Sequence, residues 1–332
     1  MSDDLPQNPD RRRMMGGIAG GVAAAGLAGA AQAQQSGNDA APLTRMRDPQ
    51  TAYPEPPFPK QQQDWPGLAS RMDPVPDHGE DSYRGANKLQ GRRALITGGD
   101  SGIGRAAAIA FAREGADVAI NYLPDEEEDA QQVIALIEEA GRRAVAIPGD
   151  ITDADFCQQL VQQAVDELGG LDILVNNAGY QQSSPSIEDI SEEQFDQTMK
   201  TNVYAPFRIT KAALPHLNEG ASIIITASVV AQQPPENLFD YSQTKAANVI
   251  YAQVLAKQLA SRGIRVNAIA PGPFWTPLQV VGGQPADAIP EFGSTTAIGR
   301  PGQPVEIAPL YVLLASAESS YSTGQLFEAT GG

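Results

Sequence analysis

The sequence predicts an α/β fold in which helices cover both faces of a doubly wound parallel sheet. Short apolar runs alternate along the chain with longer helical patterns, and a glycine-rich turn follows the first of these runs. A strand buried on both faces is apolar throughout, and strands separated by helices pair in parallel. Right-handed crossovers then place the helices on both faces of one sheet.

Seven apolar runs are expected to form the buried strands of this sheet. In chain order they are Ala94–Thr97, Val118–Tyr122, Ala144–Pro148, Ile173–Asn176, Ile223–Thr226, Val266–Ala270 and Gln325–Ala329. The helical patterns between and after them are Ile103–Arg113, Glu126–Ala140, Asp153–Leu168, Ser191–Leu217, Phe239–Ser261 and Pro304–Ala317. The second of these helices begins with acids and is followed by arginines, as the helix dipole favours.

The first 33 residues resemble an export signal rather than part of a folded domain. The basic run Arg11-Arg12-Arg13 precedes a Gly- and Ala-rich stretch from Gly16 to Ala31, and Ala31-Gln32-Ala33 is a small-x-small cleavage site. This pattern is typical of a twin-arginine signal, which would make the protein periplasmic or exported. The alternative is a disordered tail on a cytoplasmic protein. The stretch is too short and too rich in glycine for an anchor, so we expect no stable membrane insertion.

Residues 34–88 are expected to form an extended arm and not a second domain. Nine prolines lie between Pro42 and Pro76, and no apolar period survives there. The arm could pack on its own core or wrap a neighbouring subunit, and Phe58 and Trp65 are candidate anchors for that packing. The globular domain then spans residues 89–332.

The composition excludes several classes of function. Lys and Arg total 23 against 40 Asp and Glu, and a net charge of −17 repels nucleic acid. The single cysteine, Cys157, permits no internal disulfide and no cysteine-rich zinc site. The two histidines, His78 and His216, lie far apart in sequence. We therefore expect no metal site.

A glycine-rich turn lies where a nucleotide-binding fold needs one. Gly98, Gly102 and Gly104 follow the run Ala94–Thr97 and precede an alanine-rich helical pattern. Glycines allow a sharp turn and a close backbone approach, and the N–H groups at the start of the helix then face a pyrophosphate. The alternative is a tight turn with no ligand.

The spacing of this turn, Thr-Gly-x-x-x-Gly-x-Gly, resembles the short-chain dehydrogenase/reductase family, which has a Rossmann-type fold. Other motifs of that family follow in its order: Asn176-Asn177-Ala178-Gly179, Asn202 in Thr201-Asn202-Val203, Ser228, Tyr241-x-x-x-Lys245, and Pro271-Gly272 with Thr276. The resemblance covers about Leu89 to Gly332. The proline-rich arm is also similar to that of a bacterial subgroup of aldehyde reductases and glucose-1-dehydrogenase-like proteins.

The resemblance implies hydride transfer between a nicotinamide dinucleotide and a carbonyl or alcohol substrate. Tyr241 and Lys245 are four residues apart, so they share a helix face, and the ammonium is expected to lower the pKa of the phenol. Tyr241 would then act as the general acid/base, and Ser228 would donate to the same substrate oxygen. In the family, the lysine also binds the nicotinamide ribose, and the counterpart of Asn202 holds a water that relays protons.

The family's cofactor-binding positions map onto matching positions of this chain. They are Gly98, Asp100, Ser101, Gly102, Ile103, Gly104, Asn121, Tyr122, Asp150, Ile151, Asn177, Ala178, Gly179, Tyr241, Lys245, Pro271, Gly272 and Thr276. Asp150 could instead cap the next helix.

The choice between NAD(H) and NADP(H) depends on the end of the second strand. Ile120-Asn121-Tyr122 carries neither the acid typical of NAD binding nor a basic residue for the 2′-phosphate. The acids Asp125 to Asp129 follow, and their field disfavours an added phosphate, so the balance favours NAD(H) by a small margin. The acids could equally be a solvated helix start. Arg105 and Ser101 could compensate, and the aldehyde-reductase resemblance points to NADP(H).

The expected substrate contacts are Ser228, Val230, Tyr241 and Trp275, although Trp275 could equally pack within the lid expected at Leu278–Thr296. Oxidation of a sugar or polyol is an alternative reaction. A dinucleotide-sensing protein without catalysis is an alternative class, which the set of Ser228, Tyr241 and Lys245 argues against. Because the family commonly forms tetramers through the helices that carry Asn202 and Tyr241, we expect a homo-oligomer.

Overall fold

The computed structural model describes residues 43–332, and the expected signal and the start of the arm lie outside the described residues. Its centre is a seven-stranded parallel sheet with the order β3-β2-β1-β4-β5-β6-β7. The strands are β1 Arg93–Thr97, β2 Asp117–Tyr122, β3 Ala144–Pro148, β4 Leu171–Asn176, β5 Leu217–Thr226, β6 Arg265–Pro271 and β7 Leu326–Ala329. The predicted doubly wound fold is confirmed.

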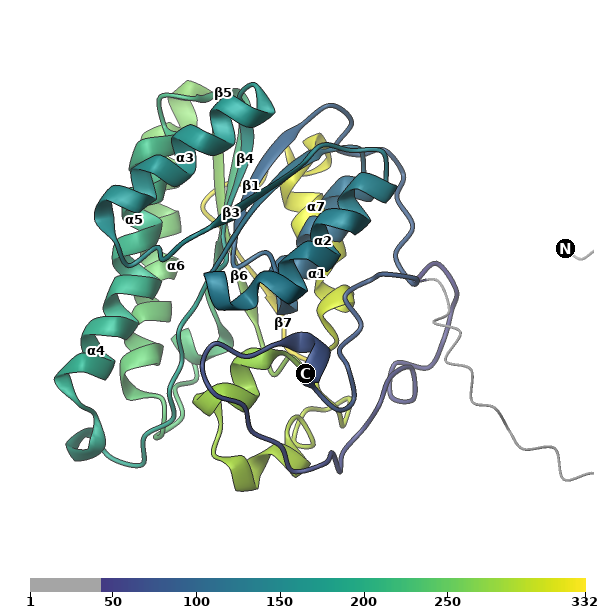
Figure 1. Ribbon diagram of the computed structural model, residues 1–332, viewed down its shortest axis with the longest axis vertical. Coiled ribbons are helices and arrows are strands. Elements are labelled where there is room, and N and C mark those ends of the chain that lie inside the picture. Colours follow the sequence, from purple (N-terminus) through teal and green to yellow (C-terminus); the bar gives the residue numbers. More distant parts are fainter. Residues whose placement is uncertain (1–42) are drawn as a thin grey trace, which may run out of the picture. The chain divides into compact units, whose positions relative to one another are not determined.

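Two groups of helices cover the two faces of the sheet (Figure 1). The helices are α1 Gly102–Arg113, α2 Glu127–Glu139, α3 Ala154–Leu168, α4 Glu192–Met199, α5 Ala205–Ala213, α6 Phe239–Leu259 and α7 Pro304–Ala315. Side chains of α1, α2 and α7 share one hydrophobic core, and those of α3, α5 and α6 share the other. Among residues 43–332, none of the helices combines the length and the apolarity needed to cross a membrane.

The strands are apolar at successive positions because each face of the sheet has its own core. In β1, Ala94 and Ile96 belong to the core under α1 and α7, whereas Leu95 between them belongs to the core under α3 and α6. Successive side chains of a strand point to opposite faces, so a strand that is buried on both faces is apolar at consecutive positions. Parallel pairing then brings the carboxyl ends of the central strands to one edge.

The predicted helix Ser191–Leu217 is wrong in two respects. It is divided by a π-helical turn, Lys200–Tyr204, and it ends at Ala213, while Leu217 already belongs to β5. Leu217 pairs with Leu171 ahead of a register shift in the ladder, so the strand begins earlier than its apolar run. Apolar periodicity does not detect either feature, because both depend on side-chain and cross-strand contacts.

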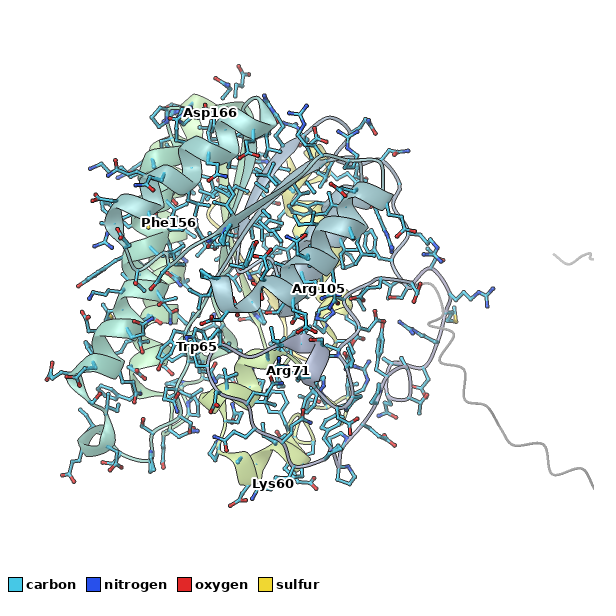
Figure 2. All side chains as sticks on the ribbon, viewed as in Figure 1. Lys60, Trp65, Arg71, Arg105, Phe156 and Asp166 are labelled. Carbon is cyan, nitrogen blue, oxygen red and sulfur yellow. The ribbon has the colours of Figure 1, made fainter. Side chains whose placement is uncertain are left out.

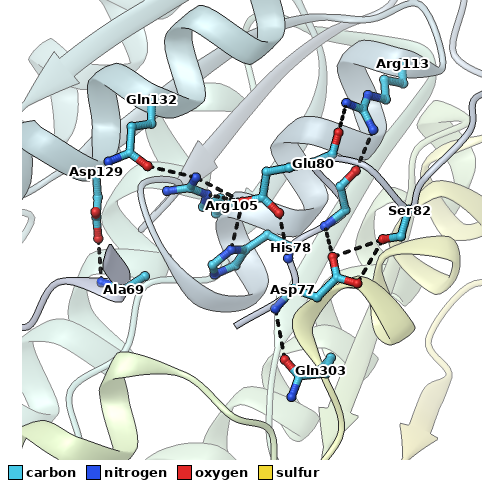
Figure 3. A network of polar contacts seen from close by, with 11 residues as sticks. Ala69, Asp77, His78, Glu80, Ser82, Arg105, Arg113, Asp129, Gln132 and Gln303 are labelled. Atoms are coloured by element: carbon cyan, nitrogen blue, oxygen red, sulfur yellow. Dashed lines mark hydrogen bonds and ion pairs between the residues drawn. The ribbon is translucent and has the colours of Figure 1, made fainter. Parts of the chain in front are cut away.

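The described part of the arm packs on its own domain and does not hang free. Buried Glu114 accepts hydrogen bonds from the Tyr83 hydroxyl (2.7 Å) and from the backbone N–H groups of Ala86 (2.8 Å) and Lys88 (2.9 Å). Arg113 donates to the carbonyl oxygen of Glu80 (Figure 3) and also to those of Gly79 and Tyr83, so its guanidinium holds a turn of the arm. The end of α1 therefore anchors the arm.

A third, smaller core joins the arm to the segment of residues 276–295. Phe58 stacks on Trp275 with ring centroids 4.2 Å apart, and Val280 and Ile289 are buried in the same cluster. The N–H of Phe58 donates to the carbonyl of Pro290 (2.9 Å). Phe58 therefore anchors the arm, as the sequence predicted.

Candidate active site

A cavity of about 550 Å³ runs along the carboxyl edge of the sheet. It is lined by the glycine-rich turn after β1, by residues at the ends of β2, β3, β4, β5 and β6, and by the buried face of α6 that carries Tyr241 and Lys245. In open α/β sheets, ligands bind in a crevice outside the carboxyl ends of the strands. The segment of residues 276–295 and two residues of the arm, Trp65 and Gly67, complete the wall.

The glycine-rich turn has no space for side chains. Gly98 has a φ of +61°, and a Cβ there would lie 3.0 Å from the Cα of Ala178. A Cβ at Gly104 would overlap the carbonyl oxygen of Gly98. Ser101, the N-cap of α1, makes no side-chain capping bond, so the first N–H groups of α1 stay available beside the cavity. This cradle fits a dinucleotide pyrophosphate.

Asn177 connects the turn to the neighbouring strands. Its side-chain amide donates to the carbonyls of Thr97 (3.2 Å) and Gly98 (3.1 Å), and its Oδ1 accepts from the Thr226 hydroxyl (3.2 Å). The Thr97 hydroxyl accepts in turn from the N–H groups of Asn177 (3.0 Å) and Ala178 (3.1 Å). One side chain therefore joins the ends of β1, β4 and β5.

Ser228, Tyr241 and Lys245 all line this cavity. Ser228 lies just after β5, and the other two lie on the same face of α6. The Nζ of Lys245 lies 5.3 Å from the centroid of the Tyr241 ring and donates to the carbonyl of Thr226 (2.8 Å). Side chains from the end of β5 and from α6 thus converge on one part of the cavity.

Burial dominates the proton affinities of these groups. It raises the pKa of the Tyr241 phenol, and the hydrogen bond with Ser228 offsets only part of that rise. Burial lowers the pKa of Lys245 to about 8. The expected net lowering of the Tyr241 pKa is therefore wrong for this structure, since the cost of burying a phenolate outweighs the other influences and decides the direction. The phenol keeps its proton at neutral pH and can donate it.

Asn202 lies in the π-helical turn and does not line the cavity directly. Its Oδ1 accepts from the N–H of Tyr180 (2.8 Å), and its Nδ2 donates to the Tyr180 carbonyl (2.8 Å) and to the Thr244 hydroxyl (3.0 Å). Asn202 therefore fixes the backbone of Tyr180, next to the cavity wall at Gly179. The water relay that the family resemblance implies stays a prediction.

The structure brings almost the whole predicted cofactor set together. Every predicted cofactor residue except Gly104 lines the cavity, and Gly104 supports it by packing against Gly98. Of the predicted substrate contacts, Val230, Ser228 and Tyr241 line it. Asp150 lines it too, and its side chain accepts from the N–H of Thr152 (2.8 Å). It is Asp153, not Asp150, that caps α3.

The prediction that Trp275 contacts the substrate is wrong. Its side chain is fully buried, its Nε1 donates to the carbonyl of Pro74 (2.8 Å), and its ring stacks on Phe58. The arm covers Trp275 through Phe58 and Pro74, and the sequence does not predict where the arm lies. The sequence analysis also missed Gly67 and Glu126 as lining residues, because nothing local marks a residue for a distant cavity.

Acids gather at the end of the cavity beside β2. Buried Asp100 has its pKa raised to about 6 by burial, with a smaller contribution from the neighbouring Asp129. Burial and the charge of Asp100 raise the pKa of Glu126 to about 8. Arg105 does not face them as a free cation, because its guanidinium binds Glu80 of the arm (3.0 Å) and Gln132 (3.1 Å; Figure 3). Because its guanidinium is already bound to these two side chains, Arg105 is not free to compensate a 2′-phosphate as expected.

Within residues 43–332, no group of three or more His, Cys, Asp or Glu side chains is arranged to hold a metal ion. The cradle for a pyrophosphate and the hydroxyl and amine groups beside it are features of a nucleotide-dependent oxidoreductase. Comparison with known proteins agrees. Residues 98–332 match a family model described as enoyl-(acyl carrier protein) reductase.

An uncharacterized oxidoreductase of Bacillus subtilis is 56% identical over 292 residues, which are 87% of this chain and 98% of the relative. Glucose and ribitol dehydrogenase of Daucus carota is 43% identical over 82% of this chain and 96% of its own. The chloroplastic NADPH-dependent aldehyde reductase 1 of Arabidopsis thaliana is 44% identical, with 80% and 94% covered.

A crystal structure of a short-chain dehydrogenase from Burkholderia cenocepacia in complex with NADP is 39% identical and has a TM-score of 0.69, covering 74% of this chain and 98% of that one. This chain belongs to the short-chain dehydrogenase/reductase family. It is therefore an oxidoreductase with a nicotinamide cofactor. The comparisons name NADP or NADPH and give no support to the small margin in favour of NAD(H).

The lowered pKa of Lys245 predicts the pH dependence of carbonyl reduction. Below about pH 8 the amine is charged and stabilises negative charge on the phenol as Tyr241 gives up its proton; above it the charge is lost. We expect kcat/KM to fall above about pH 8, approaching tenfold per pH unit. A pH series of initial rates with one aldehyde measures this.

Lys245→Arg is the control for this series, because a guanidinium stays charged over the whole range. The variant should lose the break even if its absolute rate is lower. A flat profile for the unmodified protein between about pH 7 and about pH 10, or the same break in both proteins, would contradict the assignment to Lys245.

Proposed function

We propose that this protein reduces the carbonyl group of a small, uncharged molecule, with Tyr241 as the proton donor. The observation that carries the proposal is the convergence of Ser228, Tyr241 and Lys245 on the cavity that the glycine-rich turn also lines. A protein that only sensed a dinucleotide would have no use for a buried acid and amine beside its ligand. The bound nicotinamide would supply the hydride.

Each of the three side chains has a distinct role in this proposal. Tyr241 gives its proton to the carbonyl oxygen as that oxygen gains negative charge. The Ser228 hydroxyl donates a hydrogen bond to the same oxygen and so orients and polarises it. Lys245 keeps one N–H on the Thr226 carbonyl, which leaves its other donors for a ribose hydroxyl and its charge beside the phenol.

The lining of the cavity supports an uncharged substrate. In the described part of the chain, the charged side chains on its wall are Lys245, Asp100, Glu126 and Asp150, and all but Glu126 belong to the predicted dinucleotide set. The uncharged lining residues are hydroxyl, amide and apolar side chains, and the amide and apolar ones include Gln181, Asn237, Gln284, Val230, Leu278 and Phe292. Among residues 43–332, Lys245 is the one cation on the wall, and no second one is present there to pair with a carboxylate or phosphate of the substrate.

Oxidation of a sugar or polyol by the same groups is the second candidate. The lining amides of Gln181, Asn237 and Gln284 could bind several hydroxyl groups, and one relative is named for glucose and ribitol. The same assay separates the two candidates, because it compares aldehydes with sugars and polyols in both directions.

Replacing Tyr241 by Phe tests the reaction itself. The variant keeps the ring and loses the proton, so we expect kcat for aldehyde reduction to fall by about 100-fold or more. Binding of reduced dinucleotide, followed by its fluorescence, should change less than about threefold, since the cavity wall remains. Tyr321→Phe, at a fully exposed position, is the control. A Tyr241→Phe variant with full turnover, or an unmodified protein that turns over no carbonyl compound or alcohol in a broad panel, would refute the proposal.

We also propose that the protein prefers NAD(H), although relatives are named for NADP and NADPH. The support is electrostatic. The carboxyl groups of Asp100 and Glu126 line the cavity beside the end of β2, and Arg105 is bound to Glu80. A 2′-phosphate dianion placed there would be repelled by Asp100 at neutral pH, and by Glu126 as well once its carboxyl ionises above about pH 8. Among the described lining residues the one cation is Lys245, which lies beside Tyr241.

The preference predicts a ratio of kcat/KM for NADH over NADPH of about tenfold or more. Above about pH 8 the Glu126 carboxyl is ionised, so at about pH 9 Glu126→Gln removes one charge while it retains an acceptor for the N–H of Leu123, and it should lower that ratio by about fivefold. At about pH 6.5, where the carboxyl is protonated, the same variant should change the ratio much less. Asp125→Asn removes an exposed charge one residue away and should leave the ratio nearly unchanged. A preference for NADPH in the unmodified protein would overturn the proposal.

We further propose that the chain assembles with copies of itself through α5 and α6. Tyr204, Phe207 and Ile250 line one shallow apolar pocket there, with exposed fractions from 43% to 58%, and Val254 lies one helical turn beyond Ile250 and is 47% exposed. Patches of this kind on a soluble domain typically mark interfaces. The face that these residues form includes α6, which carries Tyr241, and α5, which directly follows the π-helical turn that carries Asn202.

Light scattering should therefore give a mass of several chains for the unmodified protein. Ile250→Lys places a charge in the centre of the face, so we expect the mass to fall to half or less at micromolar concentration. Ile187→Lys, at another exposed apolar position, should leave the mass unchanged. An unmodified protein that is monomeric would contradict the proposal.

A further inference from the structure

A short loop of the arm is closed by the side chain of Gln63. The Nε2 of Gln63 donates to the carbonyl of Leu68 (3.0 Å), and its Oε1 accepts from the N–H of Leu68 (2.9 Å). Both hydrogen-bonding groups of one side chain therefore fasten the two ends of the loop that carries Trp65 and Gly67. Figure 2 marks Trp65 on this run of the arm, between Lys60 and Arg71 in sequence.

This loop is attached to the segment of residues 276–295. The N–H of Gln63 donates to the carbonyl of Val280 (3.0 Å). A Cβ at Gly67 would overlap the Cγ1 of Val281, so the arm backbone is in closest contact with that side chain. Lys60 pairs with Asp287 farther along the same segment. The loop and the segment thus form one continuous part of the cavity wall, to which Gly67, Val281 and Trp65 all belong.

Trp65 lies at the end of the cavity where the reacting groups lie. Its ring meets the ring of Tyr180 edge to face, with centroids 5.0 Å apart and an interplanar angle of 83°. The backbone of Tyr180 is bonded on both sides to Asn202. A Cβ on Gly179, the preceding residue, would lie 3.6 Å from the Nζ of Lys245. Trp65 is therefore connected to Lys245 through the ring of Tyr180 and the adjoining backbone of Gly179.

The indole of Trp65 is only partly covered by its neighbours. Its exposed fraction is 40%, whereas Trp275, the other tryptophan of the chain, is fully buried. A large apolar ring that is held in place yet left open to a cavity is suited to contact a ligand.

We propose that Trp65 of the arm is a specificity-determining residue, whose indole packs against the part of the substrate that lies away from the carbonyl group. The inference rests on the proposed carbonyl reduction and names the kind of substrate: an uncharged carbonyl compound with an apolar or aromatic portion large enough to reach the arm. Small aldehydes gain nothing from Trp65, because they do not reach it.

The test compares benzaldehyde with acetaldehyde as substrates for Trp65→Ala. Loss of an apolar contact of this size is worth about tenfold or more in selectivity, so the ratio of kcat/KM for benzaldehyde over acetaldehyde should fall by that factor. The rate with acetaldehyde and the Kd of the reduced dinucleotide should each change less than about threefold. Trp65→Phe should retain most of the ratio, and Val75→Ala, at an exposed arm position outside the cavity, should retain all of it.

Tryptophan fluorescence provides a second readout that does not depend on the alanine variant folding. Trp275→Phe leaves Trp65 as the single tryptophan, and Trp65→Phe leaves Trp275. Addition of oxidised dinucleotide and benzyl alcohol should shield Trp65 from acrylamide by about twofold or more relative to dinucleotide alone, and should not change the quenching of Trp275. Should Trp275→Phe fail to fold, the difference between the unmodified protein and Trp65→Phe reports the same quantity.

These experiments distinguish a wrong role for Trp65 from a wrong assignment of carbonyl reduction. If the unmodified protein turns over both aldehydes and Trp65→Ala leaves their ratio unchanged, Trp65 does not determine specificity and the reduction stands. An equal loss for both aldehydes also refutes the role, since it indicates general damage to the wall. If the unmodified protein turns over no carbonyl compound, the proposed function is wrong and the Trp65 assignment falls with it.

Discussion

The geometry of the cavity depends on the hydrogen bonds of Asn177. Its amide donates to the ends of β1 and accepts from the end of β5, while its own backbone ends β4. Three neighbouring strand ends are therefore held at one spacing. Thr226, which donates to Asn177, also offers the carbonyl that holds Lys245. The glycine-rich turn fits because Gly104 has no Cβ to overlap this network. Cofactor cradle and catalytic lysine are thus positioned by a single side chain and its immediate partners.

Burial gives these groups their chemistry. The same exclusion of water lowers the pKa of Lys245 and raises that of Tyr241, so the charged form of each is disfavoured. A phenol that keeps its proton at neutral pH is suited to donation, which agrees with a reductive direction. The arm contributes to this exclusion, because it joins residues 276–295 in a small core of their own beside the cavity.

The arm also explains where the sequence analysis was wrong. Both Phe58 and Trp65 were expected to be anchors. Phe58 is one, but Trp65 lies at the cavity, and Trp275, which was expected at the substrate, is covered by the arm. The alignment with the Burkholderia dehydrogenase structure covers 74% of this chain. The alignment with the Bacillus relative covers 292 residues, which is more than the segment from Leu89 to Gly332 contains. The likeness to that relative therefore extends into the arm.

The sequence by itself determined the sheet, its helices and the glycine-rich turn, because these follow from apolar period and glycine spacing. The motifs that resemble a known family indicated Ser228, Tyr241 and Lys245, and the four-residue spacing of Tyr241 and Lys245 placed that pair on one helix face. It did not determine the π-helical turn that divides the long helix at Asn202, or the ion pair of Arg105 with Glu80. It also did not determine that Trp65 lines the cavity while Trp275 is buried under the arm. Each of these is a contact between residues far apart in the chain, and only the folded backbone brings such residues within reach. Local patterns carry no information about a partner that lies 22, 25 or 201 residues away.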